Sequence, residues 1–326
     1  MFSLSLISAY WIDLLIICFI IFLMWDNWNK GFLSNTVEFT IFLASFISAI
    51  IFYPIIAYLF IEYVAFPYGL ANGVSLFILT VVFQELYTSA SAVYIEEVPE
   101  KWPFSKLYNK FAFLPIVGQS IIITAFFSVV MLCLPISSRL KVALASSKIA
   151  PVLYSNVQKF ENSLNKILPM RLGNTLIFLA VNPRLPENVK LHFTVNDLNW
   201  DEAYEQELFK LINKERIRMN FMPFVYDTAL QTIARGHVSH LAKLGYLSNW
   251  DENGKNSTIR MNDAGISFLK STEIVALSPD SSVTMLGIMT VDTYRLSLLS
   301  PNLVKSGIGV VDAGIYGRLV VIELTD

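Results

Sequence analysis

Histidine, the side chain best suited to acid–base and metal chemistry near neutral pH, occurs three times in this chain, and two of the three stand out. His237 and His240 are three residues apart in a segment with helical periodicity, so both imidazoles lie on one side of a helix. Imidazole is a common Zn²⁺ ligand, but a zinc site needs three or four ligands. The pair alone falls short of a site. We therefore expect core or surface histidines, with no bound metal and no cofactor.

No nucleophile has a recognisable partner in the sequence. Cys18 and Cys133 both lie in apolar stretches, so the polar half of the chain has neither a disulfide nor a Cys–His pair. There is no Gly-x-Ser-x-Gly elbow and no glycine loop before a helix that would cradle a phosphate. The run "GIGVVDAG", residues 307–314, falls in a predicted hairpin instead. These features favour a binding protein over an enzyme.

Two carboxylates of the apolar first half, Asp13 and Glu38, lie near the ends of predicted membrane helices. An intramembrane carboxylate is a functional candidate because a charge in the bilayer is costly. The alternative is that both reach the membrane interface and are hydrated. Their positions near the ends of the apolar stretches favour this alternative.

The elements that hold these residues fall into two classes. Residues 1–138 contain 12 charged residues and the remaining 188 contain 38, while 54% of the whole chain is hydrophobic. A helix needs about 20 mostly apolar residues to cross a bilayer, and residues 4–25, 39–60, 64–83 and 111–138 meet that requirement. The first stretch has no basic residues before it and is too long for a signal peptide. We predict an all-α transmembrane domain of four helices over residues 1–138, with oligomerisation through these helices as a further expectation.

The run "WIDLLIICFIIFLMWDNWNKGFLSNTVEFTIFLASFISAIIFYPIIAYL" resembles the colicin V production protein family. That family has an Asp early in helix 1 and a basic-Gly-Phe turn before helix 2, and Asp13 and Lys30-Gly31-Phe32 stand at these positions. The segment "LYNKFAFLPIVGQSIIITAFFSVVMLCLPIS" is similar to its helix 4, although the family usually has more glycine there. The resemblance covers residues 8–138. It makes Asp13, Lys30, Gly31 and Glu38 the site candidates of the membrane half.

The connector, residues 139–200, begins with an amphipathic helix pattern over residues 148–171. This helix either lies on the bilayer surface or membrane domain, or packs as an ordinary interdomain helix. The rest reads as a linker with one strand from Lys190 to Val195.

The polar half, residues 201–326, opens with two amphipathic helices. The first begins at Asp201, and the second begins after Asp227, a good N-cap residue. At the end of the chain, "SGIGVV" and "RLVVIEL" are two β runs joined by "DAGIYG" and predict a hairpin.

These segments resemble the CAP superfamily (cysteine-rich secretory and pathogenesis-related proteins) in its bacterial, disulfide-free form. Residues 208–248, "LFKLINKERIRMNFMPFVYDTALQTIARGHVSHLAKLGYLS", follow the first two helices of that family. "RMNDAG", residues 260–265, is similar to its third helix, and "TYRLSLLSPNLVKSGIGV" aligns with its segment from His-Arg to Gly-x-Gly-Val. The resemblance covers residues 203–326. It implies an α+β domain, an α-β-α sandwich with an antiparallel sheet.

The resemblance also implies a cleft with two histidines and one or two glutamates, sometimes holding a divalent metal. Asn249 and Tyr294 occupy the two histidine positions here, and Glu273 in "STEIVAL" is the glutamate that is kept. Asn and Tyr are poor Zn²⁺ ligands. His237 matches a family histidine that is mostly structural. We expect a ligand cleft of Asn249, Glu273, Tyr294 and His237 without metal or catalytic residue, in which Glu273 either contacts ligand or is a buried, hydrogen-bonded carboxylate.

The sequence therefore predicts a multi-pass protein of a bacterial cytoplasmic membrane with a non-catalytic CAP-like domain outside the cell, because relatives of that family work outside the cytoplasm. Its ligand would be a cell-wall component, a lipid or a protein. A net charge of −2 gives no basic surface for nucleic acid. Two alternatives stay open. One is a transport or secretion-related protein with the CAP-like domain as sensor, and the other is a cell-surface hydrolase that uses Glu273.

Overall fold

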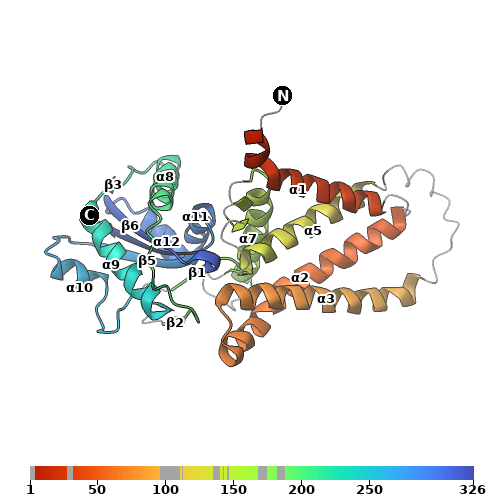
Figure 1. The fold of residues 1–326 in the computed structure, drawn as a ribbon, viewed down its shortest axis with the longest axis horizontal. Coiled ribbons are helices and arrows are strands. Elements are labelled where there is room, and N and C mark those ends of the chain that lie inside the picture. Colours follow the sequence, from red (N-terminus) through yellow and green to blue (C-terminus); the bar gives the residue numbers. More distant parts are fainter. Residues whose placement is uncertain are drawn as a thin grey trace. The chain divides into compact units, whose positions relative to one another are not determined.

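The computed structural model describes residues 4–27, 32–95, 111, 113–134, 140–141, 143–144, 147–167, 175–181 and 188–326. The chain divides into two compact units, which we call the helical unit and the α/β unit (Figure 1). The helical unit comprises Met1–Leu134 with Arg139–Val157, and the α/β unit comprises Pro135–Ser138 with Gln158–Asp326. The sequence-based boundaries at residues 138 and 200 stay predictions.

Four long helices make up most of the helical unit: α1 (Leu4–Asn27), α2 (Phe32–Val64), α3 (Tyr68–Ile95) and α5 (Phe113–Cys133). α5 packs against each of the other three, and α2 packs against α3. Three segments in the described residues are long and apolar enough to cross a membrane, namely Ser34–Val64, Tyr68–Ser91 and Phe113–Cys133, while Trp11–Trp25 is a shorter apolar stretch. The fourth predicted crossing stays a prediction.

The break between α2 and α3 differs from the expected one. Val64, expected to open the third span, ends α2 instead. Ala65 then adopts a left-handed backbone with φ of 58°, and Pro67 stands just before α3 because proline is tolerated at the start of a helix but not inside it. α2 runs through Pro54, which membrane helices tolerate.

Close helix packing explains the glycines at the start of α3. A Cβ added to Gly69 would lie 2.6 Å from the carbonyl oxygen of Cys133, and one added to Gly73 would lie 2.7 Å from its Cβ. Small residues four apart let the backbones of membrane helices approach. These glycines weaken the hydropathy of the predicted span, but in the structure they allow the end of α5 to pack closely against α3.

The α/β unit is built on a five-stranded sheet with the order β1-β5-β7-β6-β3. Its strands are β1 (Leu179–Ala180), β3 (Val225–Tyr226), β5 (Ser271–Ser278), β6 (Lys305–Asp312) and β7 (Arg318–Thr325). β6 and β7 form the predicted hairpin. β3 pairs with β6 in parallel, so the expectation of an antiparallel sheet is wrong at this edge. The long connection from β3 to β6 through helices permits parallel pairing.

The predicted strand of the connector, Lys190 to Val195, is wrong except at Lys190. β2 (Val189–Lys190) pairs with β4 (Tyr246–Leu247) in a separate two-stranded ladder. The amphipathic pattern before it forms α7 (Ala150–Ile167).

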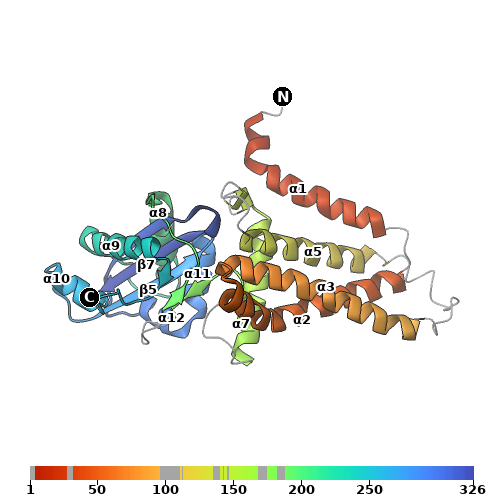
Figure 2. The same cartoon turned by 60° about the horizontal axis from the view of Figure 1, so that its bottom comes forward.

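Helices cover the sheet, with α8 (Glu202–Arg218), α9 (Thr228–Leu244), α10 (Ser257–Asp263), α11 (Ser281–Thr290) and α12 (Asp292–Leu298). The sheet lies between α9 and α12 (Figure 2). Asp227 caps α9 as predicted, accepting hydrogen bonds from the N–H groups of Ala229 and Leu230. α9 packs directly on β6 at two glycines. A Cβ added to Gly307 would come within 2.2 Å of the α9 backbone, and one added to Gly309 within 2.5 Å.

Candidate functional sites

Three of the four residues expected in the cleft meet in one cluster. His237 comes from α9, Asn249 follows β4, and Glu273 lies on β5. The Asn249 amide donates to Glu273 Oε2 at 3.3 Å, and His237 Nε2 lies 2.9 Å from the Ser248 carbonyl oxygen and 3.8 Å from Glu273 Oε1. Tyr294, the fourth, is buried on α12, which packs against α11.

Three further residues complete this cluster, which we call the carboxylate cluster. Arg260 on α10 donates to Glu273 Oε1 at 2.5 Å and lies 3.9 Å from Glu323 Oε1. Glu323 on β7 is directly opposite Glu273 in the strand pairing, so both carboxyl groups project from the same face of the sheet. Ser257 donates to Glu323 Oε2 at 2.6 Å. The one sequence signal for Glu323 is a glutamate inside the apolar run "RLVVIEL".

The charges in the carboxylate cluster balance internally. Burial and the neighbouring charge of Glu273 raise the pKa of Glu323 well above the ordinary value, so Glu323 stays protonated. Burial lowers the pKa of His237, which stays neutral. Arg260 then balances Glu273. Glu323 Oε1 receives no hydrogen bond from the residues that the structure describes. When Glu323 is protonated, this oxygen can donate a hydrogen bond to Glu273.

The carboxylate cluster is closed to solvent. Glu273 is 4% exposed, Glu323 0% and His237 2%. A general base needs access to the proton that it removes, and Glu273 is instead occupied by Arg260 and Asn249. Within the described part of the chain, no group of three or more His, Cys, Asp or Glu is arranged to hold a metal ion. The geometry therefore favours the interpretation of Glu273 as a buried, hydrogen-bonded carboxylate.

Asp13, a candidate of the membrane half, caps the start of α7. Its carboxylate accepts from the Ser147 hydroxyl at 2.6 Å and from the backbone N–H groups of Lys148 and Ile149 at 3.0 Å each. The Ser147 hydroxyl in turn accepts from the N–H of Ala150 at 3.0 Å. Asp13 is buried, which differs from the expected hydrated carboxylate. It satisfies donors that a helix start leaves without an intrahelical partner.

The other membrane candidates do not join Asp13 in a described site. Glu38 is half-buried on α2. Lys30 and Gly31 lie outside the described residues.

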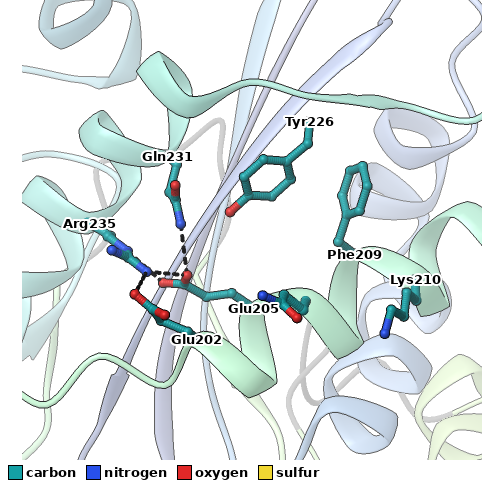
Figure 3. Close-up of a pocket in the computed structure, with 8 residues that line it drawn as sticks. Glu202, Glu205, Phe209, Lys210, Tyr226, Gln231 and Arg235 are labelled. Carbon is teal, nitrogen blue, oxygen red and sulfur yellow. Dashed lines mark hydrogen bonds and ion pairs between the residues drawn. The ribbon is translucent and has the colours of Figure 1, made fainter.

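A second feature of the α/β unit was not expected from the sequence. A groove of about 440 Å³ is lined by Glu202, Glu205, Gln206, Phe209, Lys210, Tyr226, Gln231 and Arg235, which come from α8, β3 and α9 (Figure 3). We call it the α8–α9 groove. Glu205 is buried at its base. No sequence motif indicates the groove, because its residues come from separate positions on two amphipathic helices and a short strand.

No family model matches this chain, and no curated protein matches it. Three similar solved structures match parts of it. An extracellular protein containing an SCP domain from Bacillus anthracis is 20% identical over 38% of this chain and 40% of its own, with a TM-score of 0.35. A cysteine-rich secretory protein from Staphylococcus aureus is 15% identical over 38% of this chain and 39% of its own, with a TM-score of 0.33.

The third structure is an outer surface protein from Borrelia burgdorferi, 14% identical over 40% of this chain and 98% of its own, with a TM-score of 0.39. The matched region thus spans about 40% of the length of the first two structures. Those two are described as SCP-domain or cysteine-rich secretory proteins, the class that residues 203–326 resemble. At TM-scores below 0.5 the likeness transfers no property to this chain. The resemblance of residues 8–138 to the colicin V production family stays a prediction.

Proposed function

We propose that this protein is a membrane-anchored, non-catalytic binding module, with its CAP-like unit on the outer face of a bacterial cytoplasmic membrane. The observation that carries the non-catalytic part is the carboxylate cluster. Glu273 is held by Arg260 and Asn249, and burial raises the pKa of the second carboxyl group, Glu323, well above its ordinary value. Such a cluster stabilises the fold and leaves no free base for hydrolysis.

Membrane anchoring is supported by the three helices that are long and apolar enough to span a bilayer. Their composition leaves the α/β unit as the polar part of the chain that can meet a ligand in water. Its ligand, on this proposal, is a component of the cell surface.

The full chain in lipid nanodiscs tests the proposal. We expect no hydrolysis of peptidoglycan, ester or peptide substrates, and no change in melting temperature on adding a chelator. Turnover that disappears in Glu273→Gln while the variant stays folded would overturn the non-catalytic proposal. A Zn²⁺-dependent rise in melting temperature that His237→Ala removes would reveal a metal site.

A further inference from the structure

The α8–α9 groove has a rigid base. Glu205 accepts hydrogen bonds from Gln231 at 2.9 Å, from Arg235 at 2.6 and 3.0 Å, and from the backbone N–H of Val310 at 3.1 Å. These partners tie α8 to α9 and to β6. Arg235 is further held over the Trp200 ring, 5.2 Å from its centroid. A site whose base is fixed before binding loses little entropy when it is occupied.

The wall of the groove offers an aromatic surface beside polar groups (Figure 3). Phe209 and Tyr226 pack edge to face, with ring centroids 5.0 Å apart, and both rings are partly exposed. Burial, followed by the nearby charge of Glu205, raises the pKa of Tyr226 to about 12. The phenol therefore remains neutral. Gln206 and Lys210, both exposed on α8, add an amide and an ammonium group.

The charges in the groove cancel. Glu202 and Glu205 oppose Lys210 and Arg235, and Arg235 pairs with both carboxylates, at 3.2 Å and 2.6 Å. A charged ligand of either sign would meet a like charge, which counts against phosphate groups and polybasic peptides. A lipid tail would need an apolar lining, which two aromatic rings among six polar side chains do not supply.

A neutral sugar chain fits this combination. The hydroxyl and acetamido groups of a sugar both donate and accept hydrogen bonds. In the groove, the glutamine amides do both, the carboxylates accept, and the lysine and arginine donate. The apolar C–H face of a sugar ring can pack on an aromatic ring. We propose that the α8–α9 groove binds a short stretch of neutral glycan. This inference rests on the proposed function, because it names the ligand class of the binding module.

The test uses the full chain in nanodiscs and the neutral tetrasaccharide of β-1,4-linked N-acetylglucosamine, titrated by calorimetry. We expect saturable binding that weakens by about tenfold, or about 1.4 kcal/mol, in Phe209→Ala and in Lys210→Ala. The matched control is Lys214→Ala, since Lys214 is also an exposed lysine of α8 but does not line the groove. It should bind like the wild type. Tyr226→Phe keeps the ring but removes a hydroxyl that can hydrogen-bond a sugar, so it should also weaken binding. It provides a second readout if Phe209→Ala fails to fold.

The outcomes separate the two proposals. If Lys210→Ala and Tyr226→Phe both leave binding unchanged, the groove is not the binding site. The protein would still be a glycan-binding module. Absence of binding to both the tetrasaccharide and purified neutral glycan strands would overturn the glycan inference. In that case, binding to lipid or protein probes in the same assay would preserve the proposed function, and hydrolysis of the tetrasaccharide would overturn the non-catalytic proposal.

Discussion

At the scale of single residues, Glu273 and Glu323 share one buried cluster but have different partners, and the same substitution should have opposite effects at the two positions. The pKa of Glu323 is raised in the folded state above the unfolded value of about 4.3. Above about pH 4.3 the Glu323 carboxyl group therefore loses its proton in the unfolded chain and keeps it in the folded chain. The stability contributed by Glu323 is fully present below that pH and is lost as the pH rises toward the folded pKa.

Glu323→Gln should raise the melting temperature at pH 7, because glutamine stays neutral in both states, accepts from Ser257 and can donate to Glu273. The melting curves of variant and wild type should converge near pH 4. A variant that is less stable than the wild type at pH 7 would contradict a protonated Glu323.

Glu273→Gln should have the opposite effect, because Arg260 loses its ionised partner. We expect a loss of about 1–3 kcal/mol in the free energy of unfolding, measured by chemical denaturation of the full chain. The double variant reports the coupling: effects that add would show that the two carboxyl groups do not interact.

The cluster also shows how far residue-level prediction reaches. His237, Asn249 and Glu273 were found together because a family resemblance supplied their positions. Arg260 and Glu323 were missed, since nothing in a linear pattern brings an arginine of α10 to glutamates on β5 and β7. The balance of charge that decides the chemistry depends on these two residues.

At the scale of elements, the contact between α9 and β6 depends on the absence of side chains. Gly307→Ala should destabilise the α/β unit by about 1–3 kcal/mol, the usual cost of overpacking, because the new Cβ would meet the α9 backbone at 2.2 Å. Gly236→Ala is the control. It lies on α9 itself with open space around it, so it should stabilise by about 0.5–1 kcal/mol. Equal effects in thermal unfolding would contradict the close approach.

The capping of α7 by Asp13 gives a prediction for the helical unit. Asp13→Ala should lower its stability by about 0.5–2 kcal/mol, as the loss of an N-cap does, measured by unfolding in detergent. Glu62→Gln, which changes an exposed carboxylate of α2 in the same unit, should change little. An Asp13→Ala variant as stable as the wild type would leave the carboxylate free for a role other than capping.

Elements set by local signals were predicted well, and those set by distant partners were not. The hairpin of β6 and β7 and the start of α9 at Asp227 follow from alternation and capping within a few residues. The parallel pairing of β3 depends on a partner far along the chain. In the sequence the glycines of α3 only lower the hydropathy of a predicted span. Their packing role is visible only in the structure, where Cys133 lies against them.

At the scale of the whole molecule, the number of membrane crossings decides where the α/β unit works. α2, α3 and α5 are long and apolar enough to cross a membrane, and α1 decides whether the crossings number three or four. Its 24 residues extend about 36 Å at 1.5 Å per residue, which is enough for a hydrocarbon core of about 30 Å. We therefore expect four crossings, with both termini outside the cytoplasm.

Reporter fusions separate the two topologies. Fusions after Lys101 and after Ser138 flank the span formed by α5, so they should report opposite sides, with Ser138 outside. An N-terminal tag then decides the role of α1, because four crossings place it on the same side as Ser138 and three place it on the opposite side. A cytoplasmic signal from the Ser138 fusion would reverse the topology. The groove and the carboxylate cluster would then face the cytoplasm, and the proposal of a cell-surface binding module would fail even if the groove bound a glycan in vitro.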